Sequence, residues 1–291
     1  MSIFHVIILA IIQGMAELLP VSTSAHVVVA EKLMGMDPTA PQMTLLLVMM
    51  HAGTMFAVIA YFWNQWRRAY FHDRETFRTI ALQIIVATFF TGLIGGGLIE
   101  AIEKLAFPRP KHAEIEQLFG RLDLIAPALA LVGILILIAG LKRRNVGARD
   151  TWRDAGTGMN TAQAGWIGAV QGLCLPFRGF SRSGATISTG MLLGVSRSKT
   201  EAFSFALAVV LTPPAIAREV MRLVRAEHLT AGSDLASAMM PSLLGAFFSF
   251  VAGLVALKWL SQWLESGRWH WFGIYCLVAA CVVAYLHHVG Y

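Results

Sequence analysis

The residues best suited to chemistry in this sequence are gathered in a short segment that runs from Leu175 to Thr186. The segment lies between apolar runs, yet it carries two arginines, Arg178 and Arg182. The glycines and hydroxyl residues around them are Gly179, Ser181, Ser183, Gly184 and Thr186. Glycine lets the backbone approach a ligand, hydroxyl residues mark helix starts that bind anions, and arginine binds phosphate oxygens in bidentate fashion. We therefore predict a phosphate-binding loop, although helix capping alone would also explain the hydroxyl residues.

A second polar group lies close to the N-terminus. Gln13 and Glu17 are four residues apart, so they share one face of a helix. A carboxylate within an apolar segment indicates a functional site, here a magnesium or calcium ligand or a general base. A buried structural ion pair between Glu17 and Arg182 is the alternative.

Hydroxyl residues and histidines follow Glu17 in the first half of the sequence. Ser22, Thr23 and Ser24 are capping residues or nucleophiles. His26 suits a general acid, a general base or a nucleophile, although a lone histidine is also common in a protein core. His51 is a weaker candidate for lining the cavity of the predicted phosphate site.

The composition excludes an ordinary soluble domain. Of the 291 residues, 56% are hydrophobic and 14% are charged, whereas soluble domains carry about 25% charged residues. The net charge of +6 comes from basic residues in loops, so it requires no nucleic-acid partner. The three cysteines indicate neither a disulfide framework nor a zinc site. We predict an all-α polytopic membrane protein.

The predicted helices begin with a hairpin. A helix from Ile3 to Leu19 should stop at Pro20, and a short helix should follow from about Ala25 to Met34. At about 1.5 Å per residue the second arm crosses only half of a 30 Å hydrocarbon core, which favours a re-entrant hairpin. A second hairpin is predicted at about Ala162 to Gly194. The six longer spans, three after each hairpin, are Pro41–Trp63, Phe77–Leu98, Leu124–Leu141, Lys199–Met221, Pro241–Leu260 and Trp271–Leu286.

Matching motifs indicate an internal duplication. Gln13-Gly14 matches Gln171-Gly172, and Ser22–Ala25 matches Ser181–Gly184. Each half has three spans plus a hairpin, so it crosses the membrane an odd number of times. The second half, residues 155–291, is therefore predicted to be inverted relative to the first, residues 1–145.

Inverted repeats place discontinuous helices and a binding site near the middle of the membrane. We therefore expect the two hairpins to meet tip to tip, with Glu17 and His26 near Arg182. The basic residues predict the orientation, because thirteen fall on one side of the spans and eight on the other. The first side includes the loop from Lys142 to Arg153 and should be cytoplasmic, which leaves both termini facing outward.

At these residues the chain resembles the undecaprenyl pyrophosphate phosphatase family, of the bacitracin-resistance type. The first family motif is Glu or Gln, three residues, Glu, and then a Leu-Pro-(Val/Ile)-Ser-Ser-Thr-(Gly/Ala)-His-like run, which Gln13–His26 resembles. The second motif, Pro-Gly-x-Ser-Arg-Ser-x-x-Thr, is matched by Arg178–Thr186. Length and hydropathy resemble the family along the whole chain.

Three residues depart from the family pattern. Gln13 stands where many members have glutamate, so it offers a cation an oxygen without a charge. Thr23 stands where a serine is a proposed nucleophile, and Arg178 replaces the proline of the second motif. These changes bear on cation affinity, on a covalent mechanism and on the rigidity of the loop.

The resemblance implies hydrolysis of undecaprenyl diphosphate to undecaprenyl phosphate, which regenerates a lipid carrier for peptidoglycan and confers bacitracin resistance. Glu17 with Gln13 would hold a divalent cation, magnesium or calcium, and Arg182 would bind the diphosphate. Thr23, His26 or water would be the nucleophile. Phosphate oxygens would be held by Ser22, Ser24, Arg178, Gly179, Ser181, Ser183, Gly184 and Thr186.

The same resemblance implies a multi-pass protein of the bacterial inner membrane, with its site open to the periplasmic face and a homodimer as the assembly to test. The rival hypothesis is an inverted-repeat transporter or flippase of a lipid phosphate or another anion, because such repeats are typical of transporters. An acid phosphatase of the other membrane class is set aside. That class needs a histidine soon after its arginine–serine motif, and here none follows Arg182 before His228.

Overall fold

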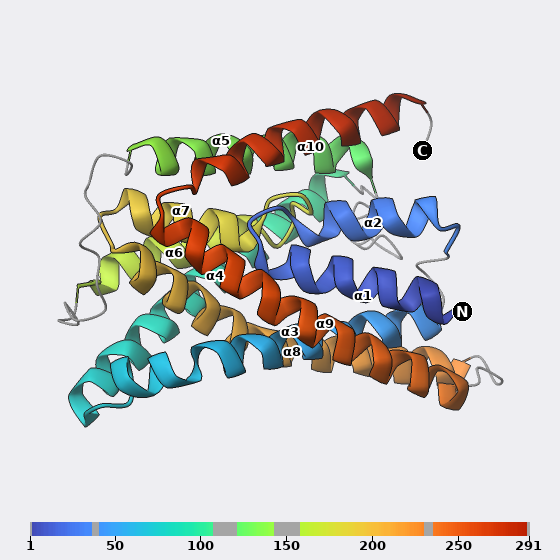
Figure 1. Ribbon diagram of the computed structural model, residues 1–291, viewed down its shortest axis with the longest axis horizontal. Coiled ribbons are helices and arrows are strands. Elements are labelled where there is room, and N and C mark those ends of the chain that lie inside the picture. Colours follow the sequence, from blue (N-terminus) through green and yellow to red (C-terminus); the bar gives the residue numbers. More distant parts are fainter. Residues whose placement is uncertain (1, 37–40, 107–120, 143–157, 230–234, 290–291) are drawn as a thin grey trace. The chain divides into compact units, whose positions relative to one another are not determined.

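The computed structural model describes residues 2–36, 41–106, 121–142, 158–229 and 235–289. Within these ranges the fold consists of ten α-helices without strands, which confirms the predicted all-α class (Figure 1). The helices are α1 (Ile3–Leu18), α2 (Thr23–Leu33), α3 (Pro41–Ala69), α4 (Arg74–Ala106), α5 (Leu122–Lys142), α6 (Thr161–Leu173), α7 (Arg182–Leu192), α8 (Arg197–Leu229), α9 (Leu235–Glu265) and α10 (His270–Val289).

Six helices, α3, α4, α5, α8, α9 and α10, are long and apolar enough to cross a membrane. They coincide with the six predicted spans, and the chain is a multi-pass membrane protein. Most of them extend past the predicted ends because the flanking polar residues continue the helix beyond the apolar run. Helix α3, for example, continues past Trp63 through Arg67 and Arg68 to Ala69.

The other four helices form two short hairpins, α1 with α2 and α6 with α7. Helix α1 ends at Leu18, and Leu19 is extended, with ψ of 152°, because it precedes Pro20. Helices α2 and α7 have 11 residues each, so each reaches about 16 Å, roughly half of the hydrocarbon core. The short arm predicted after Pro20 is confirmed, and α7 is its counterpart in the second hairpin.

The helices divide into two compact units, and each unit combines segments from both halves of the sequence. The first contains Met1–Leu19, His26–Trp63 and Ala208–Leu260. The second contains Pro20–Ala25, Asn64–Leu207 and Ser261–Tyr291. The turn of the first hairpin thus belongs to the same unit as the whole of the second hairpin.

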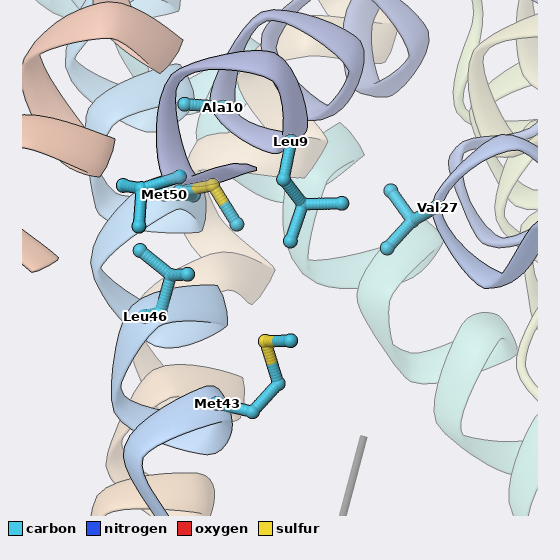
Figure 2. Close-up of a cluster of buried hydrophobic side chains, with 7 residues drawn as sticks. Leu9, Ala10, Val27, Met43, Leu46 and Met50 are labelled. Atoms are coloured by element: carbon cyan, nitrogen blue, oxygen red, sulfur yellow. The ribbon is translucent and has the colours of Figure 1, made fainter. Parts of the chain in front are cut away.

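A buried hydrophobic cluster holds α1 in the first unit (Figure 2). Its members are Val6, Leu9 and Ala10 of α1, Val27 of α2, and Met43, Leu46 and Met50 of α3. Gln13 lies one helical turn beyond Leu9, and His51 follows Met50 directly. The same packing therefore brings polar side chains of α1 and α3 together at the edge of the cluster.

Glycine allows close helix packing in both units. A methyl group at Gly14 would lie 2.6 Å from the Ser249 carbonyl oxygen of α9, and one at Gly172 would lie 3.0 Å from the Thr91 carbonyl oxygen of α4. In the sequence, Gly172 follows Gly14 by the same number of residues as Ser249 follows Thr91. The two glycine contacts are therefore related by the same spacing as the matching glutamine–glycine motifs. The boundaries of the predicted halves and the inversion of the second remain predictions.

Residues 143–157 join the two predicted halves and lie outside the described residues. They include most of the basic loop, Lys142 to Arg153, on which the predicted orientation depends. Within the second unit, α5 packs along α10 and against α7, while α6 packs on α4 and α7 (Figure 1). The second hairpin is thus held between long helices.

Candidate active site

The second hairpin presents a helix start at the predicted phosphate loop. Helix α7 begins at Arg182, and the hydroxyl of its N-cap, Ser181, accepts a hydrogen bond of 3.3 Å from the Gly184 amide. Gly179 has φ of 121°, and a Cβ there would overlap the Ile125 carbonyl oxygen. Only glycine fits that backbone. The loop therefore delivers Arg182 to the first turn of a helix, where backbone amides favour an anion.

The other polar residues of this loop differ in their surroundings. Ser183 is buried, with its hydroxyl oxygen 3.5 Å from that of Ser181, while Arg178 is exposed and Arg182 is half-buried. The Thr186 hydroxyl donates to the Arg182 carbonyl oxygen at 2.8 Å and lies 2.6 Å from the Ser204 hydroxyl oxygen. Thr186 thus joins α7 to α8, and its predicted contact with phosphate stays a prediction.

The first hairpin turns through an unusual backbone conformation at Ser22. Its φ is 65°, the left-handed region that non-glycine residues rarely adopt, and its hydroxyl accepts a hydrogen bond of 3.5 Å from the Ala25 amide. Such strain is typical of functional sites. Thr23 and Ser24 follow, half-buried, in the first turn of α2. Both hairpin tips therefore have a serine cap one residue before a helix.

The tips meet within the second unit, as predicted. A Cβ at Gly184 would lie 3.3 Å from the Pro20 Cβ, and the Cys276 thiol of α10 donates to the Pro20 carbonyl oxygen at 3.1 Å. The hydroxyl-bearing turn of the first hairpin and the arginine-bearing start of α7 are therefore packed as one body. Cys174, Cys276 and Cys281 are free thiols.

Glu17 lies in a polar cluster with Gln13 and His51 in the first unit. The Gln13 side-chain amide donates toward the Glu17 carboxylate at 3.4 Å, and its nitrogen lies 3.3 Å from the His51 Nε2. His51 Nε2 is 3.7 Å from the Glu17 carboxylate, and His51 Nδ1 is 2.8 Å from the Leu47 carbonyl oxygen. Sequence reasoning left His51 only a weaker place among the candidates, because the packing of α1 on α3 that makes this contact leaves no local signal.

His26 lies half-buried in α2 and belongs to the first unit, as Glu17 does. Arg182 belongs to the second unit, so the predicted approach of Glu17 and His26 to Arg182 remains a prediction. Among the described residues no group of three or more His, Cys, Asp or Glu side chains is arranged to hold a metal. One carboxylate with an amide oxygen nevertheless suits a magnesium-type ion, which keeps several waters and takes substrate phosphate oxygens.

Comparison with known proteins decides the family. The family model described as bacitracin resistance protein BacA matches residues 6–282. The chain belongs to the BacA family. It is 55% identical to undecaprenyl-diphosphatase 2 of Acinetobacter baylyi over 97% of each chain. It is also 30% identical to an undecaprenyl-diphosphatase of Rhodopirellula baltica, over 98% of each chain.

A further relative supports the same conclusion. An undecaprenyl-diphosphatase of Christiangramia forsetii is 32% identical, over 98% of this chain and 99% of that protein. These three relatives match along almost their full lengths and are all named as undecaprenyl-diphosphatases. They give the transporter hypothesis no support.

Proposed function

We propose that this protein hydrolyses undecaprenyl diphosphate to undecaprenyl phosphate and inorganic phosphate. The observation that carries the proposal is the 55% identity, over 97% of each chain, to undecaprenyl-diphosphatase 2 of Acinetobacter baylyi. The reaction breaks a phosphoanhydride bond and recycles a lipid carrier for peptidoglycan synthesis. Removal of the diphosphate would also confer the bacitracin resistance that the family description names.

The second hairpin binds the diphosphate in this proposal. Arg182 supplies two parallel hydrogen bonds to phosphate oxygens, and the first amides of α7 add partial positive charge. Ser181 fixes the start of the helix, and Ser183 follows it in the first turn. Such preorganised donors stabilise the charge that shifts onto the phosphoryl oxygens in the transition state.

The first hairpin supplies the reacting groups. Thr23, His26 and a water molecule are the candidate nucleophiles, and the attack on the terminal phosphorus releases undecaprenyl phosphate. Glu17 and Gln13 would hold a magnesium or calcium ion, which supplies positive charge to the phosphoryl oxygens when bound. The contact of 3.4 Å between the Gln13 amide and the Glu17 carboxylate on one face of α1 supports this role.

The proposed location is the bacterial inner membrane, with the site open to the periplasmic face. A single cysteine placed between Lys142 and Arg153, in a variant lacking the three native cysteines, should be labelled from the cytoplasmic side alone. Labelling from outside would reverse the orientation. Crosslinking in the membrane tests the proposed homodimer, and a monomer at all protein densities would exclude it.

Phosphate release by the purified protein tests the function. Wild type in lipid vesicles should release phosphate from a C55 prenyl diphosphate when magnesium or calcium is present, and a chelator should abolish the release. Binding of the lipid without phosphate release under all cation conditions would contradict the proposal. Contaminating phosphatases are controlled for by purifying the Arg182→Ala variant in the same way.

A further inference from the structure

We infer that His51 is a nitrogen ligand for the divalent cation held by Glu17 and Gln13, and that it extends the site to first-row transition metals such as Mn²⁺. The inference rests on the cation of the proposed function. His51 lies on α3, outside the sequence motifs of the two hairpins. Four features of the first unit support it.

The imidazole of His51 is already set in the tautomer that a metal ligand needs. Its Nδ1 lies 2.8 Å from the Leu47 carbonyl oxygen, one turn earlier on α3. A carbonyl can only accept, so Nδ1 carries the proton, and in the neutral ring Nε2 then presents its lone pair. Histidines that bind metals nearly always donate their other ring N–H to a carbonyl or carboxylate in this manner.

The lone pair faces the proposed oxygen ligands. His51 Nε2 lies 3.7 Å from the Glu17 carboxylate oxygen and 3.3 Å from the Gln13 amide nitrogen. Two atoms that are each about 2.1 Å from one ion lie about 3.0–3.4 Å apart. The observed separation is slightly larger, so a small rotation of Glu17 is enough to let both atoms reach one cation.

The Gln13 amide contacts both of the other proposed ligands. Its nitrogen donates toward Glu17 at 3.4 Å and faces His51 Nε2 at 3.3 Å, so one NH₂ group contacts both acceptors. Rotation of the amide would turn its oxygen, in place of its nitrogen, toward these two side chains. Gln13, Glu17 and His51 would then provide two oxygens and one nitrogen from α1 and α3.

The cluster is also accessible. The His51 side chain is 41% exposed and that of Glu17 is 19% exposed, although Gln13 is buried. Carboxylate and amide oxygens suit magnesium, calcium and manganese, whereas imidazole adds affinity for first-row transition metals such as iron, nickel and zinc. The composition of the cluster therefore predicts a broader cation preference than oxygen ligands alone would give.

Pulsed EPR of bound Mn²⁺ tests the nitrogen ligand directly. Wild type should show modulation from a directly bound ¹⁴N nucleus, and His51→Gln should still bind Mn²⁺ without that modulation. Titration calorimetry should show that His51→Gln loses Mn²⁺ affinity by about tenfold or more, the scale of changes around metal sites. Its affinity for magnesium should change by less than about threefold. His72→Gln, which removes an exposed histidine from the α3–α4 turn, should behave as wild type.

Other results would overturn the assignment. Mn²⁺ modulation that survives in His51→Gln but vanishes in His26→Gln would assign the nitrogen to the other histidine. Wild-type protein labelled with ¹⁵N-histidine needs no mutation, and an unchanged spectrum would exclude any histidine ligand. Magnesium-dependent phosphate release without nitrogen coupling would refute this inference and leave the proposed function intact.

Discussion

Two glutamines in matching positions of the hairpins have different neighbours. Gln13 and Gln171 are each about 1% exposed and each precedes a glycine that packs on a helix carbonyl. Gln13 contacts Glu17 and His51, whose side chains are accessible. Gln171 instead donates to the Thr91 hydroxyl, which itself bonds the Gly168 carbonyl oxygen.

The difference shows that one repeated position can have a polar cluster as its neighbours in one hairpin and a helix interface in the other. At Gln171 the amide lies within the α4–α6 interface, where its neighbours are hydroxyl and backbone groups. At Gln13 the amide lies beside a carboxylate and an imidazole. The repeated motif thus marks where a helix packs, and the neighbouring side chains decide whether the position can take part in a reaction.

The largest expected effect concerns Arg182, in the same hairpin as Gln171. Arg182→Ala should lower the rate of phosphate release by about 1,000-fold, because removing a preorganised charge from a phosphoryl-transfer site costs at least that much. Arg178→Ala, at the exposed end of the same loop, should cost less than about tenfold. Small and equal losses from both changes would contradict the phosphate-binding role of α7.

The acid of the first hairpin should give the next largest effect. Glu17→Gln keeps the shape of the side chain and removes its charge, so phosphate release should fall by about 100-fold. The remaining activity should no longer respond to magnesium. Activity assays across a magnesium titration, normalised to folded protein, measure both effects. An unchanged magnesium response would remove Glu17 from the cation site.

Substitution of each glutamine by glutamate tests the difference between the two positions. Gln171→Glu buries a carboxylate beside Thr91 and should reduce stability by about 2 kcal/mol or more, whatever the cation. Gln13→Glu places a second carboxylate beside Glu17, so its melting temperature should rise with magnesium more than that of wild type. Thermal unfolding with and without magnesium measures the two variants. Matching responses would show that the two positions are equivalent after all.

The smallest expected effect concerns packing of the second hairpin. A Cβ at Gly168 would overlap the Ala87 carbonyl oxygen, whereas one at Gly92 would meet nothing within 4 Å. Gly168→Ala should therefore cost about 1–3 kcal/mol of stability, and Gly92→Ala should cost none. Denaturation in detergent compares the pair. Equal stability of both variants would show that α6 and α4 adjust freely.

Local signals predicted most of the fold because they depend on neighbours in sequence. Long apolar runs located the six spans, and Pro20 located the end of α1. The meeting of the hairpin tips followed from counting crossings, and Pro20 against Gly184 agrees with it. Helix ends were less accurate, since flanking polar residues continue a helix without an apolar signal.

Contacts between distant segments were beyond sequence reasoning. His51 lies 38 residues after Gln13, and nothing in its local pattern indicates that the two side chains meet. The Thr186–Ser204 hydrogen bond similarly depends on how α7 packs against α8. The division into two units that mix both halves also arises from tertiary packing, which a repeat in sequence does not specify.

The proposed function requires the two hairpins to serve one reaction. Single-turnover phosphate release by Glu17→Gln, Arg182→Ala and the double variant tests this claim most directly. Groups that act as a unit are strongly non-additive, so the double variant should be no more than about tenfold slower than Arg182→Ala alone. Losses that multiply in full, to about 100,000-fold, would show that Glu17 and Arg182 contribute independently, and would contradict the account.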